Sequence, residues 1–399
     1  MIVAHPFYRL NPSRALYING PINRDLVTRL TPQILKLQST NRNPITVYID
    51  SPGGHVGSME TILRLLKLSD QDSSGPCHVI TAVTTRAASA AADLLSSGDY
   101  AIAFPTSSIL YHGLRQQETN PLTVETTSML TNVLRFSNDI YAMSLARKIE
   151  DRFSFRYVMN RDEFGAFRTH NSDPEMSDLD CFVGIVEDKL SDGAKKVWKK
   201  AKERHERYAS LFSTVLKKIK RDIPSASEAQ IESDCIKAIV EFGLQRNKKN
   251  QSWSFKRGGI GQLVDDFFLL NEYMSNLGSE RLKKWCTSFG RWILPQEEAD
   301  KIAEIVDEQK RSEQLVRSVR PLLQPLWSFF VALCHALQEG ENELTATDAY
   351  WLGLVDEVVG ENLLSARSFE EFKPDLPPEA KHEEEQTNVS EEKTTAAGA

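Results

Sequence analysis

Three strand-like segments in the first third of the chain each end in a turn built from small or reactive residues. These turns are Ser51-Pro52-Gly53-Gly54, Arg86-Ala87-Ala88-Ser89-Ala90-Ala91 and Tyr111-His112-Gly113. Segments with helical apolar spacing follow the first two, so the pattern indicates a parallel α/β sheet. Because the carboxyl ends of parallel strands meet at one edge of a sheet, the three turns can form a single site.

The first turn has the properties of an anion-binding turn. Residues 45–50 are rich in β-branched and apolar side chains and predict a strand, whereas residues 56–66 have the apolar spacing of a helix. Glycines between them can adopt positive φ and bring backbone N–H groups close to a ligand. Gly53 and Gly54 are therefore candidate donors to an oxyanion. The alternative is a tight strand-to-helix turn without a chemical role.

Ser89 lies in a similar junction. Residues 78–84 predict a strand and residues 87–95 an alanine-rich helix. Near a helix N-terminus, unpaired N–H groups and the helix dipole favour negative charge. Ser89 is therefore a candidate nucleophile, and the N–H of Ala90 a candidate oxyanion donor. The glycines of a G-x-S-x-G elbow are missing, and an ordinary N-cap is the alternative for this serine.

His112 ends a third predicted strand, residues 107–112, one strand and a turn after Ser89. In a parallel sheet both side chains can reach the same edge. A serine hydroxyl is a poor nucleophile at neutral pH without a base, so His112 is the candidate general base. The alternative is a structural histidine at a strand end.

Five segments together resemble the ClpP peptidase family. They are residues 14–22, the Ser-Pro-Gly-Gly turn, the Ala-Ala-Ser segment, residues 104–112 and residues 344–356, which contain a Gly-Leu-Val-Asp turn. The resemblance covers roughly residues 10–164 and 341–360. It implies a crotonase-like ClpP fold, serine peptidase chemistry, assembly into rings, and an AAA+ ATPase partner that feeds unfolded polypeptide into the ring.

On this resemblance, Ser89 and His112 match the family's nucleophile and general base. The family usually has methionine and glycine after the nucleophile. This chain has Ala90-Ala91, which keeps the backbone donor but changes the pocket wall. The helix expected at residues 122–148 falls where the family's handle helix mediates contact between rings.

The third member of a catalytic triad is ambiguous. The family places an aspartate directly before the closing segment, and here the two halves of that region are separated by a long insertion. Asp162, in Asn-Arg-Asp-Glu-Phe, is our first choice, and Glu341, counted back from Leu344, is the alternative. Either carboxylate could fix the imidazole tautomer and stabilise the imidazolium.

The same reading divides the chain into four parts. They are a ClpP-like core at residues 1–164, a helical insertion at 165–340, a closing segment at 341–365 and a disordered acidic tail at 366–399. In the insertion, residues 195–221 have an apolar stripe opposite a basic face. Residues 296–319 predict another helix, and Pro321 and Pro325 predict an interruption before residues 326–337.

The composition fits a protein of a reducing compartment. The net charge is −7, without the basic excess that favours nucleic acid. Five scattered cysteines without a C-x-x-C pair argue against a disulfide framework and a zinc site. The N-terminus lacks the apolar core of a signal peptide, and no segment reaches the length of a membrane span. We therefore expect a cytoplasmic protein that needs no metal or cofactor and binds neither nucleic acid nor a membrane.

Three functions remain open at this point. The first is an ATP-dependent Clp-type serine endopeptidase subunit. The second is a catalytically inactive, ClpR-like scaffold subunit, suggested by the displaced acidic residue. The third is a crotonase-type acyl-CoA enzyme, in which paired glycine amides polarise a thioester. The presence of both Ser89 and His112 argues against this third function.

Overall fold

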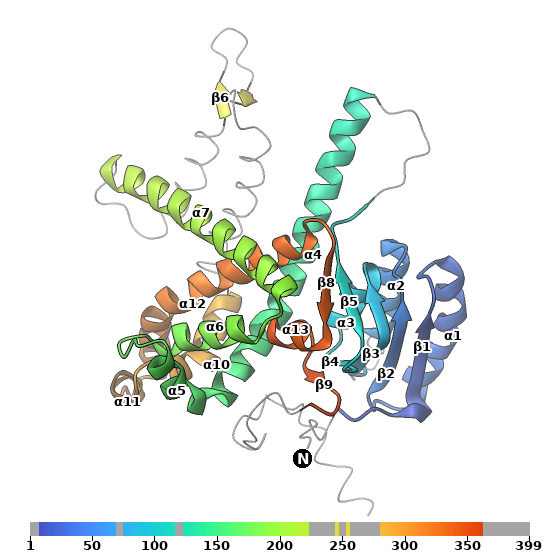
Figure 1. Cartoon of the computed structure of the whole chain (residues 1–399), viewed down its shortest axis with the longest axis horizontal. Coiled ribbons are helices and arrows are strands. Elements are labelled where there is room, and N and C mark those ends of the chain that lie inside the picture. The colour runs from blue at the N-terminus through green and yellow to red at the C-terminus, as the bar shows by residue number, and fades with distance from the viewer. Residues whose placement is uncertain are drawn as a thin grey trace, which may run out of the picture.

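The computed structural model describes residues 8–68, 75–115, 123–222, 244–246, 253–255 and 280–361. Within these ranges the chain forms a mainly parallel sheet with helices packed on it, joined at one side to a large group of helices (Figure 1). This confirms the predicted α/β class with an added, mostly helical region. The acidic tail expected at residues 366–399 lies outside the described residues.

In the described part of the chain, the main sheet has seven strands. Five run in the order β1-β2-β3-β4-β9, while β5 pairs with β3 and β8 pairs with β5. All pairs are parallel except β5 with β8. The strands are β1 (Ala15–Asn19), β2 (Ile45–Ser51), β3 (Val79–Ala88), β4 (Tyr100–Ala103), β5 (Ser108–Tyr111), β8 (Asn342–Thr345) and β9 (Glu357–Val358). Burial on both faces explains the nearly continuous apolar runs of the central strands.

The long strand β3 connects two parts of this sheet. Its first half pairs with β4, from Ile80 to Val83, and its last residues pair with β5, from Arg86 to Ala88. β3 therefore changes partner along its length, and its carboxyl end lies beside the end of β5. The two strand ends predicted to carry reactive residues thus reach one edge.

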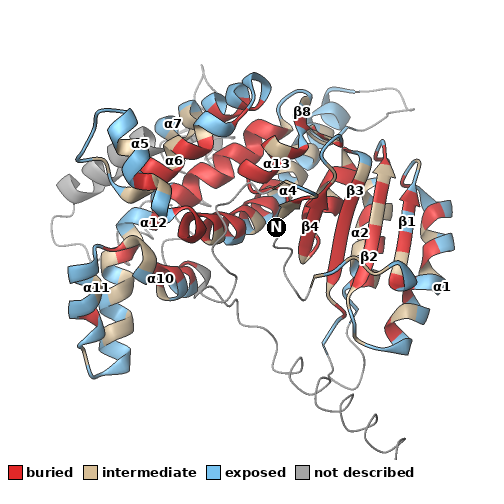
Figure 2. Ribbon diagram, turned by 60° about the horizontal axis from the view of Figure 1, so that its bottom comes forward, coloured by how far each residue is buried: buried red, intermediate tan, exposed pale blue. Residues whose placement is uncertain are grey.

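Helices α1 (Arg24–Thr40), α2 (Val56–Leu66) and α3 (Ala90–Ser96) belong to this core. α2 begins and ends where the apolar spacing predicts, and it buries Met59, Ile62 and Leu66. α3 begins later than predicted because residues 87 and 88 still belong to β3. Along α1, buried and exposed residues alternate as expected for a helix lying on the sheet (Figure 2).

Helix α4 (Val124–Met159) continues well beyond residue 148, where the sequence pattern predicts its end. Its first half projects from the body of the molecule (Figure 1) and carries exposed apolar side chains. From Ala142 onward most of its residues are buried. The helix is therefore a projecting arm in its first half and a packing scaffold in its second half.

The helical lobe, residues 164–338, packs on the second half of α4. Its helices are α5 (Phe164–His170), α6 (Asp178–Lys189), α7 (Asp192–Asp222), α10 (Glu280–Ile293), α11 (Gln296–Ala303) and α12 (Glu308–Gln338), and strands β6 (Leu244–Arg246) and β7 (Trp253–Phe255) pair antiparallel. Phe153 and Tyr157 of α4 meet Phe182 of α6 edge to face, with ring centroids 4.8 and 5.7 Å apart. One cluster of buried apolar residues extends from the sheet into the lobe, and Figure 2 shows buried residues in both parts. The lobe therefore shares the core of the sheet.

Helix α12 contradicts one prediction, because it runs without interruption through Pro321 and Pro325. Both prolines lie on the exposed side of the helix, whereas Leu323, Leu326 and Phe330 are buried. Packing of this buried face against α4, α7 and α10 stabilises the helix despite the backbone hydrogen bonds lost at the prolines. The helix break comes earlier, between α11 and α12.

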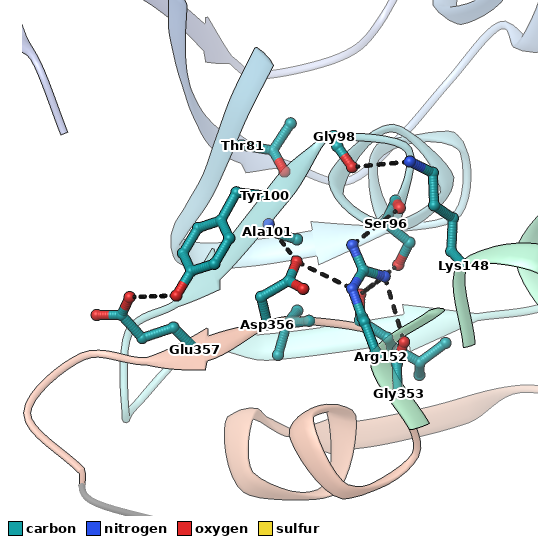
Figure 3. Close-up of polar contacts among 12 residues, drawn as sticks. Thr81, Ser96, Gly98, Tyr100, Ala101, Lys148, Arg152, Gly353, Asp356 and Glu357 are labelled. Atoms are coloured by element: carbon teal, nitrogen blue, oxygen red, sulfur yellow. Dashed lines mark hydrogen bonds and ion pairs between the residues drawn. The ribbon is translucent and has the colours of Figure 1, made fainter. Parts of the chain in front are cut away.

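The closing segment returns the chain from the helical lobe to the sheet through β8, α13 (Ala346–Trp351) and β9. Asp356 accepts the N–H of Ala101 (2.7 Å) and pairs with Arg152 of α4 (2.9 Å), as Figure 3 shows. Arg152 also donates to the carbonyl groups of Gly353 and Leu354. This largely buried, charge-assisted network holds the end of the closing segment against β4 and α4.

Candidate active site

Three strand ends form one edge of the sheet. β2 ends at Ser51, β3 at Ala88 and β5 at Tyr111. Because β2 and β5 both pair in parallel with β3, the residues that follow all three strands lie at the same edge. The structure therefore brings the turns that carry Gly53, Ser89 and His112 together.

Ser89 has an unusual backbone conformation, with φ of 57° and ψ of −129°. Positive φ is costly for a residue other than glycine, and such strain occurs preferentially at functional sites. The Ser89 N–H donates to the Leu110 carbonyl of β5 (2.8 Å), so the neighbouring strand helps to hold this conformation. The side chain makes no capping hydrogen bond. The ordinary N-cap, the alternative for this serine, is therefore not what the structure shows.

Gly53 packs directly against the Ser89 turn. A Cβ added at Gly53 would lie 2.4 Å from the Ala88 carbonyl oxygen, 2.7 Å from the Ser89 Cβ and 3.2 Å from the Ala90 nitrogen. The φ of Gly53 is +91°, a conformation that favours glycine. A side chain at this position would push the two turns apart, so glycine is what permits their contact.

The backbone N–H groups at this contact differ in their partners. Gly53 donates its N–H to Ser51 Oγ (3.1 Å), and its carbonyl accepts from Ile22 (2.8 Å). Over the described ranges of the chain, no acceptor is hydrogen-bonded to the N–H of Gly54 or Ala90. These two N–H groups are the candidate oxyanion donors. Gly53, which the sequence also suggested as a donor, instead allows the close approach.

His112 lies one residue beyond β5 and is partly exposed. Its Nδ1 is 2.7 Å from the Gly113 carbonyl oxygen. In the tautomer with the proton on Nδ1 this contact is a hydrogen bond, and Nε2 can act as a base. The Leu114 N–H donates to Asn138 of α4 (2.9 Å), which anchors the loop after His112. The backbone thus helps to orient the ring.

Glu341 lies opposite His112 across the β5–β8 pair. The antiparallel register pairs Tyr111 with Asn342, and its continuation places His112 beside Glu341. The Glu341 side chain is exposed and forms an ion pair with Arg115 (2.8 Å). The hydrogen bond and the charge of Arg115 lower the pKa of Glu341, with a smaller contribution from His112. Glu341 is thus within electrostatic range of His112, but its hydrogen bond goes to Arg115.

Asp162 lies far from this edge. It is exposed in a short 3-10 turn (Arg161–Glu163) beyond the C-terminal end of α4, whereas the His112 loop contacts α4 at Asn138. The helix between these points spans about 30 Å. Asp162 cannot orient His112 in this arrangement. The physical reason for preferring Asp162 is lost, and Glu341 becomes the better candidate for the third member.

The sequence patterns did not single out Ser51, Arg115 or Asn342. The signal for Ser51 is its place in the Ser-Pro-Gly-Gly turn. Arg115 carries no such signal, because its partner lies 226 positions away in the chain. The Asn342 side chain donates to three carbonyl groups at the end of α12 (3.2, 2.7 and 3.1 Å). It fixes the turn that carries Glu341.

The edge carries a serine hydroxyl on a strained turn, an imidazole after the adjacent strand, and two N–H groups that have no acceptor among the described residues. Such a set can attack a carbonyl carbon and stabilise the oxyanion that results. Among the residues that the structure describes, no group of three or more His, Cys, Asp or Glu side chains could hold a metal ion. The serine, the imidazole and the two N–H groups suit acyl transfer, and the role of each residue is still a prediction.

Comparison with known proteins points to the same part of the chain. The family model described as Clp protease matches residues 2–164. The ATP-dependent Clp protease proteolytic subunit 3 of Rhizobium johnstonii is 38% identical over 55 residues, 14% of this chain and 28% of the relative. Subunit 2 of Gluconobacter oxydans is 35% identical over 106 residues, 26% of this chain and 46% of the relative. Subunit 2 of Prochlorococcus marinus (strain MIT 9312) is 29% identical over 171 residues, 39% of this chain and 79% of the relative. The chain thus spans less than half the length of the first two relatives.

Proposed function

We propose that this chain, whose residues 2–164 belong to the Clp protease family, is a serine-type endopeptidase subunit that hydrolyses peptide bonds in polypeptides. In this proposal Ser89 is the nucleophile, His112 is the general base, and Gly54 and Ala90 supply the oxyanion hole. Glu341 orients His112. The names of the relatives support the reaction class, and the geometry of the sheet edge supports the residue roles.

In the proposed reaction, His112 Nε2 takes the proton from Ser89 Oγ while Oγ attacks the peptide carbonyl carbon. The carbonyl electrons move to oxygen, and the oxyanion accepts hydrogen bonds from the two N–H groups. Collapse of this intermediate breaks the C–N bond, and the imidazolium gives its proton to the leaving amine. Water then hydrolyses the acyl-serine by the same steps, which restores Ser89 and releases the carboxylic acid.

One observation carries this proposal: Gly53 approaches the Ser89 turn too closely for any side chain. Neither an ordinary strand-to-helix turn nor a capping serine requires such a contact. This contact holds the turn that carries the Gly54 N–H beside the turn that carries Ser89 and the Ala90 N–H. An oxyanion hole beside a nucleophile requires this proximity.

Peptide hydrolysis tests the proposal. The wild-type chain should cleave members of a fluorogenic peptide library, and Ser89→Ala should abolish cleavage while circular dichroism and oligomeric mass stay unchanged. Ser39→Ala, on the exposed face of α1, is the matched control and should keep full activity. Cleavage that survives in Ser89→Ala would refute the assignment of the nucleophile.

We also propose that the projecting half of α4 stacks one ring of subunits on another, as the handle helix does in the family. Five apolar side chains are exposed there: Val124, Met129, Val133, Phe136 and Ile140. The last four recur at helical spacing and so share one face. An exposed apolar stripe of this kind marks an interaction surface. The AAA+ ATPase that would deliver unfolded substrate belongs to the same proposal.

Native mass measurement tests the assembly. Phe136→Glu should reduce stacked rings to single rings, because it places a charge within the apolar stripe. Thr131→Glu, an exposed residue on the opposite face of the helix, should leave the stacked mass unchanged. A strictly monomeric wild-type chain at micromolar concentration would contradict ring assembly.

A second candidate is an inactive, ClpR-like scaffold subunit. Two contacts favour it: Glu341 is held by Arg115, and His112 Nδ1 contacts the Gly113 carbonyl. A scaffold subunit would assemble into rings without cutting any peptide. An assembled wild-type preparation that matches Ser89→Ala in every hydrolysis assay would establish this candidate.

We place the protein in the cytoplasm as part of the same proposal. In the ranges that the structure describes, no helix combines the length and the hydropathy needed to cross a bilayer. The described cysteines are all buried and free, which suits a reducing compartment: Cys77, Cys181, Cys286 and Cys334. Cell fractionation with detection of the chain tests the assignment.

A further inference from the structure

The first turns of helix α7 carry a patch of positive charge on their exposed side. Positions 194, 197, 198 and 201 of the helix are buried, and the exposed positions between them are occupied by lysines. Residues three or four apart on a helix are neighbours, so these lysines lie on one face. The four residues, which we call the lysine patch, are Lys195, Lys196, Lys199 and Lys200.

The lysine patch has no ion-pair partner in the part of the chain that the structure describes, unlike two basic residues that follow it on α7. Lys202 pairs with Glu187 of α6, and Arg204 pairs with Glu339, just after α12. Three nearby carboxylates of α7 are exposed and pair with none of the four lysines: Asp192, Glu203 and Glu206. Like charges four residues apart on a helix repel each other, so an anionic partner would stabilise this face.

The described part of the chain ends close to the lysine patch. Its last residue, Glu361, accepts a hydrogen bond from Thr347 of α13 (3.2 Å). The next residue of α13, Asp348, accepts from both the backbone N–H and the hydroxyl of Ser191 (2.8 Å each). Ser191 directly precedes α7, and its carbonyl accepts the N–H of Lys195 (2.8 Å). The chain therefore leaves the described structure beside the beginning of α7, which lies near α13 in Figure 1.

The sequence beyond this point has the opposite charge. Residues 366–399 contain nine acidic and four basic residues. Within residues 379–392, which we call the acidic segment, there are six glutamates and one lysine. Three of these glutamates are consecutive: Glu383, Glu384 and Glu385. The acidic segment thus complements the lysine patch in charge.

The chain between them is long enough for contact. Glu383 is 22 positions beyond Glu361. A random-coil chain of this length spans about 25 Å, whereas α7 rises only about 14 Å from Ser191 to Lys200. Such a tether gives an effective concentration on the order of millimolar. Exposed ion pairs are individually weak, but a tethered segment needs only weak affinity to bind.

We propose that the acidic segment docks on the lysine patch of its own chain. Three observations carry the inference: the lysines have no partner, the described chain ends beside them, and the sequence that follows is acidic. Docked there, the segment neutralises the patch and excludes other polyanions from this face of α7. The inference does not use the chemistry of the sheet edge, so it holds for an active or an inactive subunit.

Carbodiimide cross-linking of the full chain tests this contact, because the reagent joins a carboxylate to a lysine amine when the two groups meet. Mass spectrometry of the digested protein should find links between the acidic segment and the lysine patch at low salt. Salt at about 1 M should remove them, because it shortens the screening length to about 3 Å. Mixing isotope-labelled with unlabelled chains distinguishes links within one chain from links between chains.

Charge reversal in the patch gives a second readout. Lys199→Glu combined with Lys200→Glu should lower the yield of links to the two remaining lysines by about fivefold or more, because two attractions become repulsions. The matched control is Lys283→Glu combined with Lys284→Glu, which changes an adjacent pair of exposed lysines on α10 and should keep the links. All four side chains are exposed, so both double variants should fold as the wild type does.

The reciprocal change should restore the contact. When the patch variant also carries three reversals in the acidic segment, the thermal midpoint and the protection of the segment from proteolysis should return toward wild type. The reversals are Glu383→Lys, Glu384→Lys and Glu385→Lys.

Three results would overturn the proposal. The first is a wild-type chain without links between the acidic segment and the lysine patch at low salt. The second is links that form only between differently labelled chains, which would assign the patch to a second copy. The third is an undiminished yield of links in the Lys199→Glu, Lys200→Glu variant.

Discussion

The two sides of the candidate site are held in place in different ways. On the nucleophile side, Gly53 packs against the Ser89 turn, and the backbone of Ser89 bonds to β5. On the acidic side, Glu341 is exposed, pairs with Arg115 and directly follows the last helix of the helical lobe. The first side depends on backbone packing, and the second depends on a side-chain ion pair at the surface.

On the proposed function, this difference implies a preorganised oxyanion hole and an adjustable contact between Glu341 and the base. Close packing leaves little freedom at the Ser89 turn. An exposed ion pair contributes little to stability, so Glu341 can exchange Arg115 for His112 at low cost. The helical lobe reaches the acidic side directly, because α12 leads into Glu341. We therefore expect larger effects from changes on the nucleophile side than from changes on the acidic side.

The largest effect is expected at Gly53. Gly53→Ala should abolish peptide hydrolysis and lower the thermal midpoint, because the new Cβ would lie 2.4 Å from the Ala88 carbonyl oxygen. Gly57→Ala is the matched control, since nothing lies within 4 Å of its added Cβ. Alanine in that helix stabilises by up to about 1 kcal/mol relative to glycine. A Gly53→Ala protein with normal activity would break the claim that the nucleophile side is rigid.

A smaller effect is expected on the acidic side. Glu341→Gln should lower kcat by about 10²-fold, less than the roughly 10⁴-fold loss seen when a buried orienting carboxylate is neutralised. Asp162→Asn should leave kcat unchanged, because Asp162 lies beyond the far end of α4. Arg115→Gln should keep or raise kcat, since it releases Glu341 from its ion pair.

Steady-state kinetics of the three variants show which carboxylate, that of Glu341 or that of Asp162, contributes more to kcat. Loss of activity in Asp162→Asn but not in Glu341→Gln would contradict the placement of the acidic side at β8. If neither change lowers kcat in an active enzyme, Ser89 and His112 work as a dyad. The acidic side would then have no part in the reaction.

Asn342 should show a still smaller effect on turnover. Asn342→Ala removes the donor to three carbonyl groups at the end of α12 and so loosens the turn that carries Glu341. We expect a loss of about 1–2 kcal/mol in unfolding free energy and a several-fold decrease in kcat with KM unchanged. Glu343→Gln, the next residue of β8, keeps an acceptor for Ser108 and is the control. Lower stability with normal kcat would show that this turn does not couple the lobe to the base.

The smallest effect is expected from pH at Asp93. Burial raises its pKa in the folded state to about 7, from an ordinary value of 3.8. Between these values the folded state binds more protons than the unfolded state. The contribution of protonated Asp93 to the free energy of unfolding is therefore lost as the pH rises through about 7. Asp93→Asn should raise the thermal midpoint relative to wild type at pH 8, and by less at pH 5.

Thermal unfolding from pH 5 to pH 8 checks this trend. The other titratable or charged groups near Asp93 are Tyr111, Tyr141 and Cys334, together with the paired Glu60 and Arg64 of α2. Glu60→Gln should not reproduce the trend. A difference between Asp93→Asn and wild type that does not change with pH would contradict the raised pKa.

The nucleophile side could be predicted from sequence because short segments encode it. A strand, a glycine turn and a helix follow one another within residues 45–66, and α2 has the predicted bounds. The positions of Ser89 and His112 after neighbouring parallel strands follow from the same alternation. The Gly53 N–H is hydrogen-bonded to the Ser51 side chain. This contact depends on side-chain geometry, so the sequence pattern could not predict it.

The acidic side could not be predicted in the same way, because it depends on contacts between distant segments. The preference for Glu341 over Asp162 follows from the register of β5 against β8, two strands whose residues Ser108 and Glu343 are hydrogen-bonded across 235 positions of the chain. The path of α12 through Pro321 and Pro325 depends on packing of its other face. Asp93 is visible in the sequence as a charged residue within an alanine-rich helix. Apolar spacing alone does not predict whether such a charge has a partner.

Covalent labelling with a fluorophosphonate probe tests the nucleophile assignment most directly. The probe reacts with activated serines, and mass spectrometry of digested peptides locates the adduct. In the assembled wild-type chain we predict one adduct, on Ser89, that is retained in Gly57→Ala and absent in Ser89→Ala. An assembled wild-type protein that stays unlabelled, or that carries the adduct on another serine, would contradict Ser89 as the nucleophile.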